Sequence, residues 1–145
     1  DGNGNLTYTE VAGVTGGAGG IGASLGDYDK DGDLDLMLAG PRMAIYRNEN
    51  SKGNGWLMIQ CTGTKSNRSA NGARLIATAT KKKKKVIQKR EIQSGNTFGG
   101  HNALDVHFGL GNADKVDELI IIWPSGIKQT LKSITKNQMV RVVEK

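Results

Sequence analysis

The chain has 145 residues, of which 37% are hydrophobic and 23% are charged, and its formal net charge is +6. This length is enough for one ordinary domain, or two small ones, with a real hydrophobic core. No apolar run approaches the roughly 18 residues that a membrane-spanning helix needs, so no such helix is expected. The 21 glycines, against 2 prolines, indicate many tight turns rather than a disordered, proline-rich chain.

Charge is divided unevenly along the chain. Residues 1–50 hold 3 basic and 8 acidic side chains, a net charge of −5, whereas residues 51–145 hold 17 basic and 6 acidic ones, a net charge of +11. The switch coincides with the polar, glycine-bearing stretch "NENSKGNG" at 48–55, which is typical of a linker. We therefore predict two units, one over residues 1–50 and one over 51–145.

Short runs of alternating apolar and polar residues recur along the chain, whereas helical spacing is scarce. The predicted strands cover residues 6–11, 34–39, 43–48, 56–61, 73–80, 86–93, 104–109, 117–123, 128–131 and 139–144. Turn residues about every 8 to 12 positions predict an all-β fold, as a propeller, a sandwich or a barrel. The glycine-rich "GGAGGIG" at 16–22 lacks a following helix, so we interpret it as a flexible turn and not as a dinucleotide-binding loop.

Two of the later segments allow sharper expectations. "ELIIIW" at 118–123 is apolar on both faces, which predicts a central strand covered on both sides. The adjoining "WPSG" predicts a β-turn, because Pro124 has the fixed φ that starts such a turn and Gly126 can take a positive φ.

Five aspartates alternate in "DYDKDGDLD", and they are Asp27, Asp29, Asp31, Asp33 and Asp35. A carboxylate at every second residue can turn its oxygens toward one centre, and Ca²⁺ takes about six to eight oxygen ligands. A glycine at position 32 permits the sharp bend of such a loop. We predict one calcium ion held by four of these side chains, with residue 33 ligating mainly through its backbone carbonyl and leaving its carboxylate outside.

An EF-hand loop also begins D-x-D-x-D-G, but it needs a glutamate at the twelfth position and flanking helices. Counted from Asp27, the twelfth residue is Leu38, and the strand-like "DLDLMLA" follows Gly32. The spacing therefore favours a strand–loop–strand calcium site over an EF-hand. The remaining alternative is a solvated Asp/Gly-rich turn without a metal.

Longer motifs in the chain resemble two known families. "GASLGDYDKDGDLDLMLAG" followed by "IYRNE" resembles an FG-GAP/VCBS-type repeat, the calcium-binding blade of integrin-like β-propellers, and "DGNGNLTYTEVAGVTG" resembles the stretch before such a blade. From residue 54 the chain resembles the ASPIC/UnbV domain. The matching stretches are "NGWLMIQCTGTKSNRSANGARL", "REIQSGNTFGGHN", "VHFGLGNADKVDELIIIWPSG" and "NQMVRVVEK". Together the two resemblances cover nearly the whole chain.

This combination resembles the C-terminal end of the cartilage acidic protein family, whose members are secreted or surface proteins. It implies a β-propeller-type blade fragment over 1–50 and a small β-sandwich- or barrel-like ASPIC/UnbV domain over 51–145. It also implies an extracellular, non-enzymatic calcium-binding module for interaction or adhesion, with calcium ligation at the five aspartates and no catalytic residues. The partners would be a protein or a glycan at a cell surface or in the matrix. One repeat cannot close a ring of blades, so open edges also allow self-association.

A run of five lysines departs from the family pattern, which has a short turn there. Its members are Lys81, Lys82, Lys83, Lys84 and Lys85. The run lies between two predicted strands, so it is expected at a hairpin tip. One interpretation is a solvated turn kept open by self-repulsion. The other is a site for acidic polymers, reinforced by Lys89 and Arg90, with sulfated glycans or anionic lipid headgroups as ligands.

Several isolated residues carry weaker expectations. Cys61 is the only cysteine, and its place on one strand face predicts a small buried hydrophobe, with a reactive thiol as the alternative. His101 and His107 are the only histidines, and we assign both to structural roles. Asn5 and Asn67 match the glycosylation sequon, a short motif that arises often by chance.

Three classes of function stay open at this point. The first is the calcium-stabilised extracellular interaction module. The second is a polyanion binder, either for an acidic glycan or for nucleic acid, which the charge of +11 in residues 51–145 favours. Aromatic residues make up only 5% of the chain and no base-stacking signature is present, which disfavours specific nucleic-acid binding. The third is an accessory domain of a larger enzyme.

Overall fold

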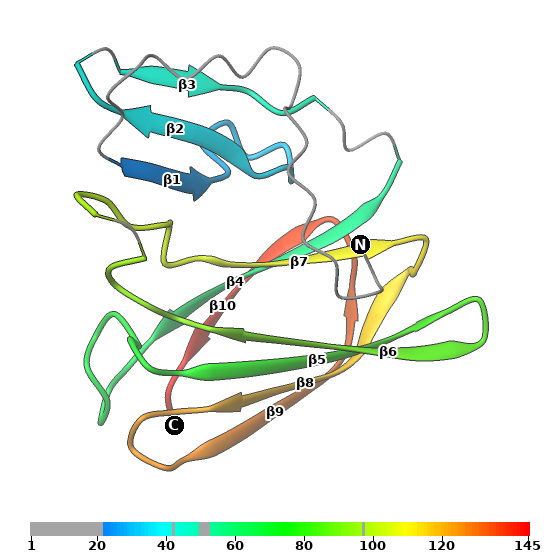
Figure 1. The fold of residues 1–145 in the computed structure, drawn as a ribbon. Coiled ribbons are helices and arrows are strands. Elements are labelled where there is room, and N and C mark those ends of the chain that lie inside the picture. The colour runs from blue at the N-terminus through cyan, green and yellow to red at the C-terminus, as the bar shows by residue number, and fades with distance from the viewer. Residues whose placement is uncertain (1–21, 42, 50–52, 97) are drawn as a thin grey trace, which may run out of the picture.

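The computed structural model of the protein describes residues 22–41, 43–49, 53–96 and 98–145 (Figure 1). Within these residues every regular element is a β-strand, which confirms the all-β prediction. The strands are β1 (Gly22–Gly26), β2 (Asp35–Ala39), β3 (Ala44–Tyr46), β4 (Gly55–Thr62), β5 (Arg74–Lys81), β6 (Lys84–Glu91), β7 (Val106–Gly111), β8 (Lys115–Ile122), β9 (Lys128–Thr135) and β10 (Gln138–Val143). The described part of the chain holds no helix long and apolar enough to cross a membrane.

The strands form three sheets (Figure 1). A small antiparallel sheet has the order β1-β2-β3 and lies at the top of the view. A second sheet has the order β10-β4-β7, with β10 parallel to β4, and a third, antiparallel sheet has the order β6-β5-β8-β9. The division into units at 1–50 and 51–145 stays a prediction, as do the blade and the sandwich or barrel assignments.

The second and third sheets share one hydrophobic core. Period-two alternation sends Leu75, Ala77 and Ala79 of β5 inward, each no more than 2% exposed. Leu57 and Ile59 of β4 face them from the other sheet and are fully buried. Each large side chain buried in this way stabilises the fold by about 1.5–3 kcal/mol.

Cys61 belongs to this core, as the sequence predicted. Its side chain lies on the same face of β4 as Leu57 and Ile59, and the residue is buried. Burial, with a smaller contribution from the negative charge of Asp105, raises the pKa of the Cys61 thiol to about 12. The thiol is therefore protonated at neutral pH, and the alternative of a reactive thiol is disfavoured.

Strand β8 is central in its sheet, as predicted, because it pairs with β5 on one side and β9 on the other. The prediction that both of its faces are covered is wrong for one face. Leu119 and Ile121 are buried in the core, but Ile120 and Ile122 are only half-buried on the opposite face. Three consecutive isoleucines therefore contribute both to the core and to an apolar outer surface.

The "WPSG" turn is confirmed by its hydrogen bonding. The N–H of Gly126 donates to the carbonyl of Trp123 at 2.9 Å, and Gly126 has a φ of +88°. The N–H of Trp123 donates in turn to Ile127 O, so the turn joins the ends of β8 and β9.

Strand β1 differs from the sequence prediction, which has no strand over these residues and interprets Gly22 as part of a flexible turn. Its sequence, "GASLG", has low strand propensity, so only pairing with β2 makes it a strand. Gly22 is required here by a close approach, because a Cβ at this position would lie 2.7 Å from the carbonyl oxygen of Phe98. The predicted strand at 6–11, residues 16–21 and Asn5 lie outside the described residues.

The lysine run lies at the tip of the β5–β6 hairpin, as predicted, and the hairpin projects at the right of Figure 1. Lys81 ends β5 and pairs with Lys84, the first residue of β6. Lys82 and Lys83 form the two-residue turn with φ values of 46° and 64°. Positive φ at both turn positions is typical of a type I′ hairpin, which normally favours Asn-Gly.

Candidate metal centre at the aspartate loop

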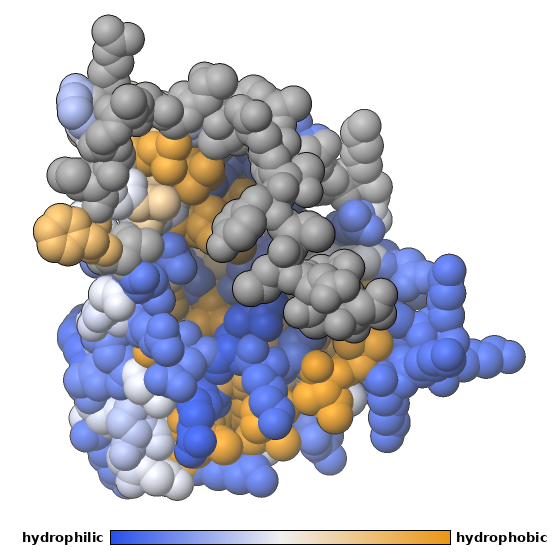
Figure 2. All heavy atoms as spheres, in the orientation of Figure 1, coloured by the Kyte–Doolittle hydropathy of each residue, from blue (hydrophilic) through white to orange (hydrophobic). Residues whose placement is uncertain are grey.

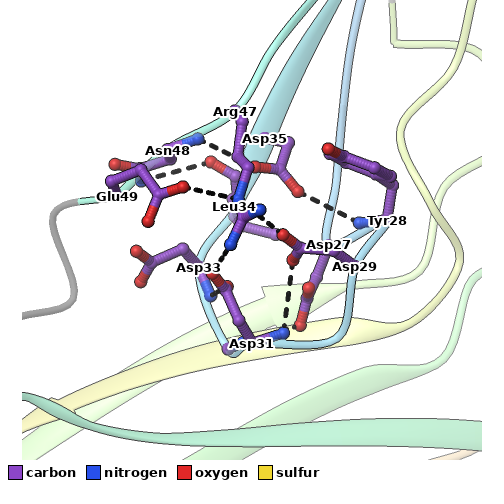
Figure 3. Close-up of polar contacts among 11 residues, drawn as sticks. Asp27, Tyr28, Asp29, Asp31, Asp33, Leu34, Asp35, Arg47, Asn48 and Glu49 are labelled. Atoms are coloured by element: carbon purple, nitrogen blue, oxygen red, sulfur yellow. Dashed lines mark hydrogen bonds and ion pairs between the residues drawn. The ribbon is translucent and has the colours of Figure 1, made fainter.

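The aspartate loop connects β1 to β2, and the strand register brings its two ends together. Gly26 at the end of β1 lies opposite Asp35 at the start of β2, so Asp27 begins the loop beside Asp35. Three carboxylates meet at this point (Figure 3): each of Asp27, Asp29 and Asp35 contributes an oxygen, and these oxygens lie within 4.8 Å of one another. The structure therefore brings together three of the five aspartates named from the sequence.

Hydrogen bonds from backbone N–H groups hold the loop in its curled shape. Gly32 N donates to Asp27 Oδ2 at 3.1 Å, and Asp31 N donates to Asp29 Oδ1 at 3.3 Å. Lys30 and Gly32 have left-handed backbones, with φ values of 63° and 99°. Backbone groups of the loop itself thus help to orient the carboxylates of Asp27 and Asp29.

Asp35 is the most enclosed of the three carboxylates, at 3% exposure. Its Oδ2 accepts from Tyr28 N at 3.1 Å and its Oδ1 accepts from Asn48 N at 2.9 Å (Figure 3). These two bonds connect the loop to the segment after β3, so Asp35 has a fixed orientation.

The oxygens of this group fit a hard cation. Asp27 Oδ1 is buried and has no hydrogen-bond partner among the described residues. Asp29 Oδ2 is also buried, and its contact is an ion pair with Arg47 Nε at 2.7 Å. Burial, followed by the charge of Asp31, raises the pKa of Asp27 even though backbone N–H groups act against it. Ca²⁺ prefers such carboxylate oxygens and would supply the missing partner.

Asp31 and Asp33 are not in the group of three. Asp31 Oδ1 accepts from Asp33 N at 2.9 Å, and its Oδ2 lies 3.7 Å from Arg47 Nη2. The carboxylate of Asp33 is turned away from Asp27 and Asp29 in Figure 3. Ligation by all five residues, and by the carbonyl of residue 33, stays a prediction.

Arg47 follows β3 and was not singled out from the sequence. Its Nε lies 2.7 Å from Asp29 Oδ2 and 2.7 Å from Glu49 Oε1. The negative charges of Asp29 and Glu49 raise the pKa of Arg47. A metal ion bound through Asp29 would compete with this guanidinium for the same oxygen.

The loop also contacts the second sheet. His107 Nε2–H on β7 donates to Gly32 O at 2.9 Å, and Gly32 lies against the indole of Trp56 on β4. Nearby, Leu25 N donates to Asn102 Oδ1 at 2.9 Å. A structural role for His107 agrees with its bond to Gly32 O. The neighbouring Asp105 accepts from Gln60 Nε2 through its Oδ1 at 3.2 Å. The imidazole of His107 and the indole of Trp56 thus connect the Gly32 peptide of the loop to the β10-β4-β7 sheet.

Sequence reasoning missed Glu144, which is 3% exposed at the end of β10. Its Oε2 accepts from the backbone N–H groups of Thr64, Lys65 and Ser66 at 2.8, 2.8 and 2.7 Å. Its Oε1 accepts from the hydroxyls of Ser66 and Ser125. Burial acts to raise the pKa of Glu144, but the hydrogen bonds from Ser125, Ser66 and Thr64 outweigh it and lower the pKa to about 2. No local motif marks such a residue, since its partners come from two distant loops.

The other isolated residues have simple surroundings. His101 is exposed, and its Nδ1 lies 2.9 Å from Asn102 O. Asn67 is exposed, and its side-chain amide exchanges two hydrogen bonds with the backbone of Asn71, each 2.9 Å long. Glycosylation of Asn67 stays a prediction.

The fold and the site define a class of protein: an all-β protein with an acidic loop suited to a hard cation. Residues 63–145 match the family described as ASPIC and UnbV, and the chain belongs to that family. It is similar to "Cartilage acidic protein 1" of Mus musculus, with 31% identity over 130 residues, and to the Homo sapiens and Xenopus tropicalis proteins of the same name, with 30% identity each. Each comparison covers 86% of this chain and 19% of the relative, so the chain spans about a fifth of the length of these relatives.

Proposed function

We propose that this chain is a calcium-stabilised extracellular module that mediates interaction or adhesion and is not an enzyme. The observation that supports this proposal most directly is the group of Asp27, Asp29 and Asp35. Within this group, Asp27 Oδ1 is buried and has no hydrogen-bond partner among the described residues. Similarity to proteins named cartilage acidic protein supports an extracellular, matrix-type role. The resemblance of residues 1–50 to an FG-GAP/VCBS repeat is part of this proposal.

Calcium should stabilise the folded chain by mass action, because only the folded loop presents the three carboxylates together. At a hundredfold excess over its dissociation constant, one ion contributes about 2.7 kcal/mol. We expect the wild-type melting temperature to rise with Ca²⁺ and to fall on chelation, and Asp29→Asn to lose most of this response. The amide keeps an oxygen that can accept from Asp31 N but removes the charge. Thermal unfolding followed by circular dichroism measures the effect.

Asp114→Asn is the matched control. It removes one carboxylate that is exposed and paired with Lys136 at 2.8 Å, outside residues 27–35. Its calcium response should equal that of the wild type. An equal response in Asp29→Asn and Asp114→Asn would refute the assignment of the loop as a calcium site.

The hairpin tip supports a second candidate function, binding of acidic polymers. Lys82, Lys83, Lys84 and Lys85 are all exposed, and no ion pair joins them to the described residues. Lysine is also a poor choice for the two turn positions, since a left-handed backbone costs a non-glycine residue roughly 1–2 kcal/mol. Backbone geometry therefore does not account for lysine at these positions, which supports a role in attracting a polyanion.

Replacing Lys82 with Asn and Lys83 with Gly should separate the effect of these residues on turn stability from their effect on polyanion binding. The double variant is expected to be more stable by about 1 kcal/mol or more, because Asn-Gly suits a type I′ turn. It should nevertheless elute from immobilised heparin at a lower salt concentration than the wild type. A variant with serine at all five positions from 81 to 85 should elute at a still lower salt concentration. Unchanged elution of both variants would leave the run as a solvated turn.

A further inference from the structure

The four-stranded sheet has an outer face that no described strand covers. Because Leu75, Ala77, Leu119 and Ile121 point into the core, their neighbours along each strand point outward. The register places Ile76 of β5 beside Ile120 of β8, and Arg74 beside Ile122. On β6, Ile87 is opposite Thr78 and is 62% exposed. The centre of this outer face is therefore apolar.

Positive side chains surround this apolar centre. The cations that strand alternation places on the outer face are Arg74, Lys85, Lys89, Lys128 and Lys132, and all five are exposed. Among the described residues none of them has an ion-pair partner, and only Glu91 and Glu118 bring negative charge to the face. Figure 2 shows hydrophobic residues exposed over these strands, in the lower half of the view, with hydrophilic residues around them.

The face is also hollowed. A depression of about 300 Å³ lies over β5, β6 and β8, and Ile76 and Ile122 line it together with Arg74, Lys89 and Glu91. An aliphatic side chain fits such a hollow, while an acidic neighbour in the same ligand would meet Arg74 or Lys89.

We propose that this outer face binds an acidic segment of a partner protein, whose aliphatic side chains enter the hollow while its carboxylates pair with the surrounding cations. Four strands spaced about 4.8 Å apart and six residues long present roughly 300 Å². That area suits one strand or helix of a partner and a weak, reversible contact, not a large obligate interface.

The chemistry of the face favours a peptide segment over the other anionic ligands. Of the four isoleucines on the face, only Ile87 projects, at 62% exposure, whereas Ile76, Ile120 and Ile122 are half-buried. A surface that inserts into a lipid bilayer would present several projecting apolar side chains. A sulfated glycan would make use of the cations but would leave the apolar centre uncovered. Only a ligand with both aliphatic groups and carboxylates uses the whole face.

This proposal rests on the interaction role proposed above but not on calcium. The test is titration of the isotope-labelled full chain with a short synthetic peptide in which glutamate alternates with valine or isoleucine, with and without a chelator. We expect amide signals of outer-face residues on β5, β6, β8 and β9 to shift in both conditions. A peptide with lysine in place of glutamate should produce no shift. Loss of calcium stabilisation with retained peptide binding would overturn the calcium proposal alone.

Two double variants with the same change in net charge, one on the outer face and one at the hairpin tip, locate the binding surface. Lys89→Glu with Lys132→Glu should weaken peptide binding about tenfold, since like charges would then face each other. Lys82→Glu with Lys83→Glu changes the net charge equally at the hairpin tip and should leave the affinity within about twofold. Ile87→Ser tests the apolar contribution and should also weaken binding.

Two outcomes would overturn the proposal: the acidic peptide could fail to bind, or the tip variant could weaken binding as much as the face variant. If the peptide fails to bind, shifts of the outer-face signals with vesicles containing phosphatidylserine, or with heparin fragments, would assign the face to those ligands instead. Circular dichroism of each variant establishes that it is folded.

Discussion

Replacing Glu144 with alanine is expected to lower the melting temperature by roughly 10 °C or more, because several buried hydrogen bonds are lost at once in a small fold. The Glu144 side chain joins the loop at 64–66, the turn after β8 and the end of β10. Without its carboxylate, three backbone N–H groups lose their common acceptor. Thermal unfolding of the purified chain measures the change, and Glu91→Ala, which removes an exposed glutamate, is the control with a small expected effect.

The same carboxylate predicts a specific dependence of stability on pH. The pKa of Glu144 in the folded chain is about 2, below its ordinary value of 4.5. A group whose pKa is lowered by folding stabilises the folded state fully above its unfolded pKa and loses that contribution as pH falls toward its folded pKa. The stability difference between wild type and Glu144→Ala should therefore be constant above pH 4.5 and shrink as the pH falls toward 2. A difference that stays constant over that range would show that ionised Glu144 does not stabilise the fold.

Much of the larger pair of sheets follows from local sequence pattern. Residues 56–61 and 73–80 alternate clearly, and they form the cores of β4 and β5. Trp123 to Gly126 form the expected turn, because proline and glycine have strong local preferences that tertiary contacts do not need to impose. The hairpin tip at Lys82 and Lys83 was likewise predictable from the two flanking strands.

Features that depend on distant partners were not predictable in this way. Strand β9 runs to Thr135, four residues beyond its predicted end. The alternating pattern did not predict these residues, because Ser133 takes a φ of 53° and interrupts the alternation before the buried Ile134. The parallel pairing of β10 with β4 joins residues about 80 positions apart, such as Val140 and Ile59.

The candidate metal centre shows the same division. The alternating aspartates pointed to the loop, and three of their side chains meet there. Local spacing did not reveal that Arg47 contacts Asp29, because Arg47 reaches the loop only through pairing of β2 with β3. Nor did it reveal the contact of Gly32 with Trp56 and His107, which requires the loop to lie on the second sheet.

The substitution Gly32→Ala is expected to destabilise the fold strongly, because it would disrupt the contact of the loop with Trp56 and His107. Gly32 has a φ of 99°, and a Cβ there would lie 2.0 Å from Trp56 Nε1. The strained backbone costs roughly 1–2 kcal/mol and overpacking roughly 1–3, so we expect a loss of about 2–5 kcal/mol. Relief of the clash moves the loop away from His107 and disturbs the bond from Gly32 N to Asp27 Oδ2, so the calcium response should weaken as well.

Two further variants separate the strain from the clash. Gly95 has a φ of 106°, and a Cβ there would meet no atom within 4 Å outside the adjoining residues, so Gly95→Ala bears the backbone strain alone and should cost less than Gly32→Ala. Trp56→Ala removes the indole that the new Cβ would meet. Adding Gly32→Ala to Trp56→Ala should therefore cost less than adding it to the wild type, by about 0.5–3 kcal/mol in a double-mutant cycle. Strictly additive effects would mean that Gly32 and Trp56 are not in contact in solution, and that the aspartate loop is held on the second sheet by other residues.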